Sequence, residues 1–456
     1  MRLIAWLLGV IGLSLFVAFV LGGAELAPAS LLMALPFVSW FLVRRRLNPA
    51  YASPVSIVLF VFASIAALGY SLRHELAKET AGVSIIIDLP EDVAWRTLIL
   101  ISVSASIMVL SAGVCLSLFR GGRARPTAIT WQARPANIWV LLASAVPLAM
   151  FLSDVPLADF FERSYYLVGA RGGIVASLGA QLAVVAVVVL GYVAATGSLG
   201  LKLGSYPLLA CYVMLMLSFG SRRFALLPVL FALGFFLARN TAGTRRGLLL
   251  GGVLSLLLLP LPLEFRSNSM HGIIPYVATL SHLDWEDIDW FGAVNNVLVS
   301  FPIIGESAYG GHPVYLSDLL VALNPLPGDA AGFYDSYQRL RLNFFTPMAG
   351  IGELGAIGWT AVAPFFAGLG AALAWIELSV RRQLVGGSLI YGGLLIALTA
   401  LFSLQMVQYN LRSAVRLLFY AIVIEIVRRM LAVVVRKRQG SAVPRGGRVR
   451  PVADRA

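Results

Sequence analysis

Long apolar runs separated by short polar segments form the dominant pattern of the chain. A helix needs about 20 mainly apolar residues to cross the hydrocarbon core of a bilayer. Such runs predict about twelve membrane-spanning helices, at 3–21, 26–43, 54–72, 97–118, 138–153, 174–196, 205–220, 224–238, 247–263, 354–376, 388–405 and 417–435. The pattern therefore predicts an all-α polytopic membrane protein. It excludes a transmembrane β-barrel, whose strands would alternate over about ten residues.

The predicted spans divide the chain into four parts. Nine spans form a membrane domain over 1–263, and a large external loop covers 264–353. Three further spans form a second membrane domain over 354–435, and a basic tail occupies 436–456. The first apolar run could be mistaken for a signal peptide. Its length exceeds the roughly 7–15 apolar residues of a cleaved signal, which favours a retained first span.

Composition supports the same class of protein. Of the 456 residues, 59% are hydrophobic and only 12% are charged, whereas soluble domains carry about 25% charged residues. Soluble enzyme folds and nucleic-acid-binding folds are therefore excluded despite a net charge of +13. Cys115 and Cys211 fall inside apolar runs, so neither a disulfide framework nor a cysteine metal site is expected.

The charged residues predict the orientation of the spans. Cytoplasmic loops are enriched in Lys and Arg. With the N-terminus in the cytoplasm, 23 of the 35 Lys and Arg residues fall inside, and 19 of the 22 acidic residues fall outside. We therefore expect both termini to be cytoplasmic, with the basic tail contacting anionic lipids. Within the last span, Glu425 has the spacing to pair with Arg428 or Arg429.

The external loop is the longest segment outside the predicted spans, and long loops are usually functional or disordered. Its many aromatic residues argue for a folded cap over the outer mouth of the bundle. Leucines at helical spacing from Tyr315 to Leu323 predict an amphipathic helix on the membrane or on the bundle. The proline-rich stretch Asn324–Gly328 should end that helix.

Histidines and carboxylates also gather in this loop. His271, His282 and His312 lie there, near the acidic stretch 284–289. Their spacing matches no metal-ligand motif, so sugar hydrogen bonding or solvated surface is the better interpretation, and metal binding remains an alternative. Aromatic rings among carboxylates suit carbohydrate stacking, but they also suit an interfacial aromatic belt.

External arginines are the sharper signal, because positive residues are disfavoured on that side. Guanidinium groups present a rigid fork of donors that suits phosphate. We therefore expect several of them to bind the diphosphate head group of a lipid; pairing with external acids or with ordinary lipid phosphates is the alternative. The candidates are Arg222, Arg223, Arg266, Arg339, Arg341, Arg412 and Arg416.

Glycines at 352, 355 and 358 recur every three residues at the start of the tenth predicted span. Such a stripe predicts close helix packing. Glu353 lies within it, and a carboxylate at the edge of a membrane helix is costly unless it is paired or used. Glu353 is therefore a candidate catalytic base or ligand for an acceptor hydroxyl.

The run from Phe345 to Trp359, followed by an apolar span with Gly368 and Gly370, resembles the signature region of Wzy-type oligosaccharide repeat-unit polymerases. Gly310–Tyr315 and Asn324–Gly328 are similar in style to that family's large external loop. Phe219–Arg223 resembles an Arg-bearing element of the wider polymerase and ligase group. An Arg-x10-Gly pattern occurs from Arg341 to Gly352 and from Arg339 to Gly350. The similarity covers about 300–370, and elsewhere only the topology agrees.

This resemblance implies a glycosyltransferase of the bacterial inner membrane that needs no metal or nucleotide sugar. It would join polyprenyl-diphosphate-linked oligosaccharide repeats into O-antigen, capsule or exopolysaccharide on the periplasmic side, together with a chain-length regulator and a flippase. Arginines would stabilise the leaving diphosphate. Glu353, with His312 and His282 as further candidates, would accept the proton of the attacking hydroxyl.

Three other functions remain open at the level of sequence. An O-antigen ligase would use the same chemistry on a different acceptor. A lipid-linked oligosaccharide flippase or other transporter should carry ionisable groups or broken helices near the bilayer midplane, which the predicted spans lack. A non-catalytic scaffold would not need clustered external arginines.

Overall fold

The computed structural model describes residues 27–76, 88–119, 135–164, 174–221, 223–239, 241–284, 286, 288–324, 332–343, 346–385 and 389–441. The first predicted span, 3–21, lies outside these residues. Helices occupy the other eleven predicted positions. Within the described ranges, β-type pairing is limited to two isolated bridges, Arg163 with His271 and Arg341 with Pro347.

Eleven long helices build the body of the protein: α2 (Ala27–Val43), α3 (Pro54–Ser71), α5 (Glu91–Phe119), α6 (Ile138–Asp154), α8 (Ile174–Thr196), α9 (Leu199–Ser218), α10 (Arg223–Ala238), α11 (Ala242–Leu257), α19 (Trp359–Val385), α20 (Leu389–Gln408) and α21 (Leu411–Ser441). Shorter elements connect them: η2 (Arg44–Arg46), η3 (Ala50–Ala52), α4 (Arg73–Leu76), α7 (Leu157–Phe161), α12 (Leu261–Ser267), α13 (Ile273–His282), α14 (Trp290–Leu298), α15 (Ser300–Tyr309), α16 (Leu316–Leu323), α17 (Phe333–Tyr337) and α18 (Gly350–Ile357).

Six helices in the described part of the chain are long and apolar enough to cross a membrane: Pro54–Ser71, Glu91–Leu118, Leu199–Ser218, Ala242–Phe265, Trp359–Val385 and Tyr391–Gln408. Three shorter apolar helices accompany them: Ile138–Asp154, Leu182–Thr196 and Arg223–Ala238. The protein is therefore an all-α membrane protein, as the apolar runs predicted.

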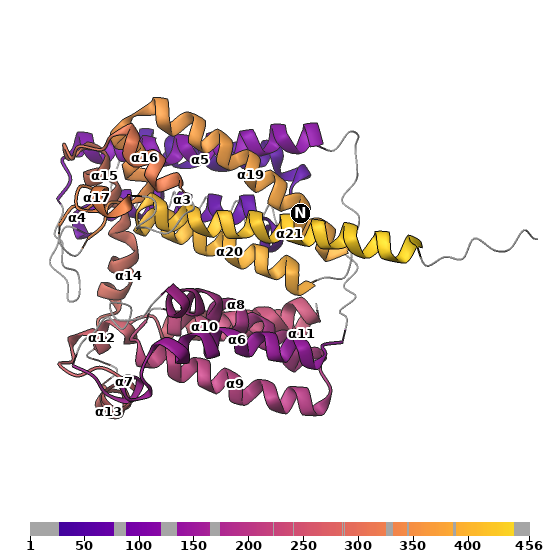
Figure 1. Ribbon diagram of the computed structural model, residues 1–456. Helices are drawn as coiled ribbons and strands as arrows, with labels where there is room; N and C mark the ends of the chain where they lie inside the picture. The colour runs from indigo at the N-terminus through magenta and orange to yellow at the C-terminus, as the bar shows by residue number, and fades with distance from the viewer. Residues whose placement is uncertain are drawn as a thin grey trace, which may run out of the picture.

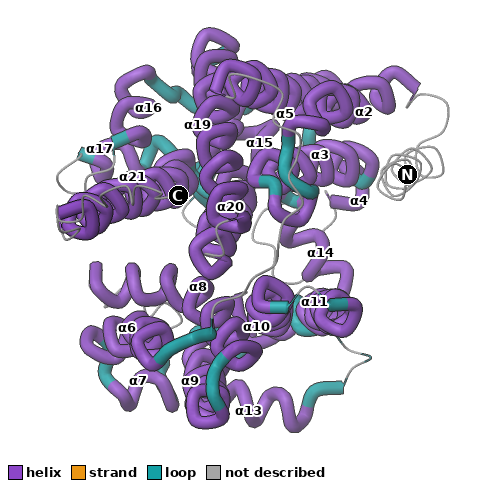
Figure 2. Tube along the Cα trace, turned by 90° about the vertical axis from the view of Figure 1, so that its right-hand side faces the viewer, coloured by secondary structure: helices purple, strands orange, loops and turns teal. Residues whose placement is uncertain are grey.

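The long helices form two groups that lie side by side (Figures 1 and 2). One group contains α2, α3, α5, α19, α20 and α21, and the other contains α6, α8, α9, α10 and α11. Helix α14 lies between the two groups at one end. The main apolar core fills the first group and continues into α8 and α10 through Tyr192 and Leu237, so the two groups share buried surface.

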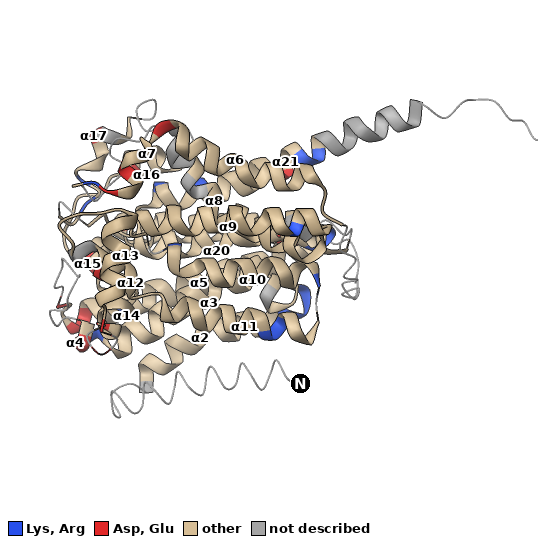
Figure 3. Cartoon of the chain, turned by 90° about the horizontal axis from the view of Figure 1, so that it is seen from below, with Lys and Arg blue, Asp and Glu red and all other residues tan. Residues whose placement is uncertain are grey.

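The two ends of the bundle differ in charge. Acidic residues gather at the end that carries α4, α7 and α16, and basic residues gather at the opposite end, near α11 and α21 (Figure 3). We call these the acidic end and the basic end. Polar contacts join neighbouring elements at each end. Arg163 bonds the Ser218 carbonyl at 2.8 Å at the acidic end, and Arg429 bonds the Ser379 hydroxyl at 3.2 Å at the basic end.

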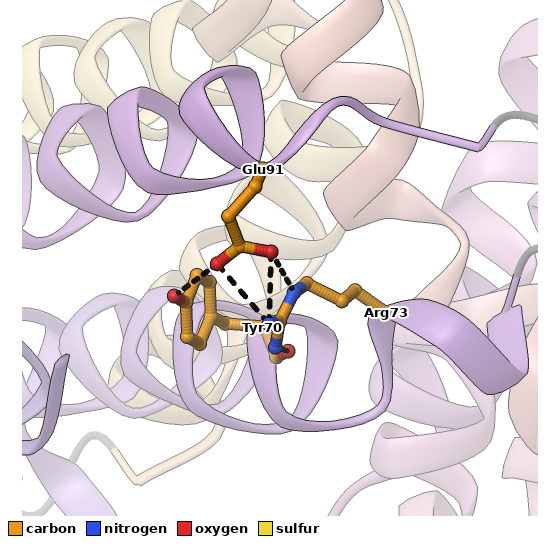
Figure 4. A network of polar contacts seen from close by, with 3 residues as sticks. All are labelled: Tyr70, Arg73 and Glu91. Carbon is orange, nitrogen blue, oxygen red and sulfur yellow. Dashed lines mark hydrogen bonds and ion pairs between the residues drawn. The ribbon is translucent and has the colours of Figure 1, made fainter. Parts of the chain in front are cut away.

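A three-residue network joins α3 to α5 at the acidic end (Figure 4). Arg73 donates to both carboxylate oxygens of Glu91, with Nη2 2.9 Å from Oε2. The Tyr70 hydroxyl donates to Glu91 Oε1 at 3.0 Å, and the Arg73 guanidinium lies over the Tyr70 ring. Two donors, Tyr70 near the end of α3 and Arg73 at the start of α4, therefore converge on a carboxylate in the first turn of α5.

The predicted pairing of Glu425 in the last long helix is confirmed. Glu425 is fully buried and forms ion pairs with Arg428 at 2.9 Å and with Arg429 at 2.7 Å. These residues lie three and four positions further along α21, on the same helix face. The Arg429 guanidinium also lies over the Trp375 ring of α19, so the pair ties α21 to α19 at the basic end.

The tenth predicted span is divided between two helices in the structure. The apolar run predicts one continuous helix over 354–376, but in the structure α18 ends at Ile357 and α19 begins at Trp359. Gly358 separates them with φ = +104°, a backbone conformation that side chains with a Cβ rarely adopt. Gly358 is therefore a break between two helices and not a member of the packing stripe.

Candidate functional site

Buried charge at the acidic end concentrates where α16, the turn after α17, α18 and the start of α21 meet. We call Asp318, Arg339, Glu353 and Arg412 the outer cluster. Asp318 pairs with Arg339, Arg412 donates to a carbonyl of α16, and Glu353 accepts from the first amide of α21. Four segments that are distant in sequence are thus linked by polar contacts.

Asp318 anchors the first turn of α16. Its side chain is only 1% exposed, and Oδ1 lies 2.8 Å from Arg339 Nη2. Oδ2 accepts the backbone amide of Tyr315 at 3.0 Å, which caps the helix. Burial by itself would raise the pKa of Asp318, but hydrogen bonds from Ser336, Tyr315 and Arg339 outweigh it and hold the pKa below its usual value. Asp318 is therefore ionised at neutral pH.

Glu353 lies in the first turn of α18 and is 3% exposed. Its Oε1 accepts the Leu411 amide at 3.2 Å, at the N-terminus of α21. Burial raises the pKa of Glu353 from 4.5 to about 8; the Leu411 amide opposes the shift, and the negative charge of Asp318 adds to it. The pKa values of the two carboxyl groups are therefore shifted in opposite directions. Asp318 is ionised and Glu353 is protonated at neutral pH.

The two arginines of the outer cluster and the neighbouring Arg341 differ in accessibility. Arg412 is 2% exposed, donates to the Val321 carbonyl at 2.5 Å and lies over the Phe333 ring. Arg339 keeps 42% of its side chain exposed while it pairs with Asp318. The half-buried Arg341 lies over the Tyr337 ring, 4.3 Å from its centroid. Arg339 is thus the arginine of this group with the most surface left for a ligand.

Glycines allow these segments to approach one another. A Cβ on Gly350 would lie 3.0 Å from the Cα of Leu411, and a Cβ on Gly352 would lie 2.4 Å from the Cβ of Ser307 in α15. The Gly350 amide also donates to the Tyr409 carbonyl at 2.9 Å. The predicted close packing is confirmed at Gly352, the first glycine of the stripe, and together with Gly350 it positions Glu353 against α21.

We expect Gly352→Ala to destabilise the protein by about 1–3 kcal/mol, because the added methyl group would overpack the contact between α15 and α18. The fall in Tm in detergent would measure this. Gly368→Ala is the matched control, since a Cβ there meets nothing within 4 Å and alanine favours a helix. Equal Tm values for Gly352→Ala and the parent would contradict the close approach.

The raised pKa of Glu353 predicts a pH-dependent stability. The folded chain holds a proton that the unfolded chain releases near pH 4.5. The resulting stabilisation, up to about 5 kcal/mol, is complete below that pH and lost as pH rises through about 8. We expect Glu353→Gln to melt several degrees above the parent at pH 9 and close to it at pH 4. Parallel Tm profiles for the two proteins would rule out the shift.

The remaining predicted arginines lie in other surroundings. Arg223 begins α10 and interacts electrostatically with Tyr409, next to the start of α21. Arg416 is half-buried one turn after Arg412. Arg222 lies outside the described residues, as does the side chain of Arg266. The structure therefore groups Arg339, Arg341 and Arg412 around α16 and α17, whereas Arg223 lies at the start of α10.

The three histidines do not join Glu353. His271 is buried, with Nδ1 2.9 Å from the Tyr276 hydroxyl, and burial together with the Arg163 charge lowers the pKa of His271. His312 Nε2 lies 3.4 Å from Glu306 Oε1 at the end of α15. His282 is exposed at the end of α13. The hydrogen bond that Glu353 accepts comes from the Leu411 amide and not from a histidine.

Asp318, the most thoroughly bonded acid of the cluster, was not among the site residues predicted from the sequence. Its signal was the position Tyr315-x-x-Asp318, where an acid three residues into a helix accepts the amide of the capping residue. The turn at Tyr409–Leu411 was not predicted either, because it carries no charge. Among the described residues, no group of three or more His, Cys, Asp or Glu side chains is arranged to hold a metal ion.

Comparison of the chain with protein-family models, with curated proteins and with solved structures found no match.

Proposed function

We propose that this protein is a glycosyltransferase that polymerises polyprenyl-diphosphate-linked oligosaccharide repeats at the periplasmic face of a bacterial inner membrane. In this proposal the chain has twelve spans, with both termini in the cytoplasm and the acidic end in the periplasm. The observation that carries the proposal is the outer cluster, where the protonatable carboxyl group of Glu353 lies against the N-terminus of α21 and within the field of Asp318, which pairs with Arg339, at one end of an apolar bundle.

The reaction transfers a growing glycan onto the hydroxyl group of a new lipid-linked unit. The acceptor oxygen attacks the anomeric carbon, the bond from that carbon to the diphosphate breaks, and the lipid diphosphate leaves with the bonding electrons. Glu353 in its ionised form accepts the hydroxyl proton. A base with a pKa of about 8 is well matched to a reaction near neutral pH.

Arginine supplies the electrostatic part of the reaction. Charge develops on the departing diphosphate, and a fixed guanidinium group stabilises it in a water-poor site. Arg339 presents exposed surface, while Arg412 holds α16 in place through the Val321 carbonyl. Because Glu353 is almost fully buried, α16 has to move away from α18 before an acceptor can reach the carboxylate.

A transfer assay with purified protein tests the proposal. Lipid-linked repeat units in detergent or nanodiscs should be converted into longer lipid-linked glycans without added metal or nucleotide sugar. If transfer occurs only when a lipid A-core acceptor is supplied, the protein is a ligase and not a polymerase. If the units stay unchanged in the assay, and a deletion strain traps them on the cytoplasmic face of its membrane, the protein is a flippase and not a transferase.

A further inference from the structure

Helix α16 has two chemically different faces. Asp318 and Ala322, one turn apart, are each 1% exposed and face the protein. Leu316 and Leu320, also one turn apart, are 62% and 65% exposed. An eight-residue helix that turns its charged side chain inward and two leucines outward is oriented for an apolar environment and not for water.

Polar contacts fix this orientation. The Asp318–Arg339 ion pair and the Asp318 cap hold the first turn. The bond from Arg412 to the Val321 carbonyl joins the last turn to α21. Rotating the leucines inward would break the ion pair and the cap, and it would take from Arg339 its carboxylate partner, which is costly. The outward direction of Leu316 and Leu320 is therefore built into the outer cluster.

Two further short helices expose apolar residues at the same end of the bundle (Figure 1). Helix α13 exposes Ile274 and Val277, and α14 exposes Trp290, Phe291 and Val294. Ile274 and Val277 are three positions apart, as are Phe291 and Val294, and Trp290 and Val294 are four apart. In each helix the exposed residues therefore share one face. Short amphipathic helices around the end of membrane spans are typical of elements that lie in the lipid head-group region.

We infer that α16 is an interfacial helix whose Leu316–Leu320 face is immersed in the bilayer leaflet at the acidic end. The partner of this face is the lipid surface, where the two leucine side chains are removed from water. The outer cluster then lies at the level of the phospholipid head groups, and a ligand can reach it sideways from the leaflet. This inference does not depend on the proposed transfer reaction.

Spin-label accessibility in nanodiscs tests the inference. In a protein with Cys115→Ala and Cys211→Ala, nitroxides are placed singly at Leu316→Cys and Leu320→Cys. Leu250→Cys serves as the lipid-facing control, because Leu250 is 66% exposed on the apolar helix α11. Gln338→Cys, an exposed position just after α17, serves as the control for water. Power saturation compares oxygen, which enriches in lipid, with a water-soluble nickel chelate.

We expect labels at 316 and 320 to favour oxygen over the chelate several-fold, as the label at 250 does, while the label at 338 favours the chelate. Labels at 316 and 320 that behave like the label at 338 would overturn the inference, since α16 would then face water. Labels shielded from both reagents would also overturn it, because protein would then cover the face. Only variants that elute with the parent protein in gel filtration are compared.

Discussion

Glu353→Gln is expected to lower the rate of glycosyl transfer about 10²–10⁴-fold, the usual contribution of a general base. Glutamine keeps the acceptor for the Leu411 amide but cannot take a proton. In the parent protein the rate should rise with pH up to about 8, because ionised Glu353 is the active form. Initial rates with a purified lipid-linked repeat, measured from pH 6 to pH 9, would show both effects.

Glu91→Gln is the matched control for this substitution. Glu91 lies at the same end of the bundle, but it accepts from Tyr70 and Arg73 (Figure 4) and has no role in the proposed reaction. Its replacement should leave the rate within a few-fold of the parent. Since Glu353→Gln is also expected to be at least as stable as the parent, lost activity could not be ascribed to unfolding. A fully active Glu353→Gln protein would remove Glu353 as the base.

Arg339→Ala should slow transfer about 10²-fold, because one preformed donor to the developing charge would be lost. Arg339→Lys should recover only part of the rate, since an ammonium group lacks the two-pronged geometry of a guanidinium group. The same assay at saturating substrate would separate turnover from binding. Arg96→Ala is the control: Arg96 is exposed and only 3.7 Å from Asp92, its partner in α5.

A purely structural role for Arg339 gives a different pattern. In that case Asp318→Asn alone would slow transfer as much as Arg339→Ala, and the double variant would be no slower than either single one. If Arg339 acts on the leaving group, Asp318→Asn should leave most of the rate intact. Tm values of the three variants would report the energy of the Asp318–Arg339 pair independently of activity.

The positions of the long helices follow from local sequence. An apolar run of about 20 residues satisfies its backbone hydrogen bonds within itself, so α3 and α5 were predictable without any knowledge of their neighbours. The pairing of Glu425 with Arg428 and Arg429 was predictable for the same reason, because its partners lie within one turn of the same helix. The segregation of acidic and basic residues to opposite ends is also encoded in the order of the charges along the chain.

The outer cluster depends on contacts that have no local signal. Glu353 bonds an amide 58 positions away, and Arg412 bonds a carbonyl 91 positions away. Nothing in the sequence distinguished the nearly buried Arg412 from the partly exposed Arg339. Both are arginines in segments predicted to be external, and only the packing of α16 against α21 separates their surroundings. The break at Gly358 was hidden by an unbroken run of apolar and small residues.

Local hydrophobicity and charge order were thus sufficient to predict helices, membrane class and the two ends of the bundle, since each depends on residues within a turn or a span of one another. The chemistry at the acidic end depends on burial and on the field of distant groups. Desolvation raises the pKa of Glu353 while donors from three places lower that of Asp318. Such effects exist only after α16, α18 and α21 have packed together.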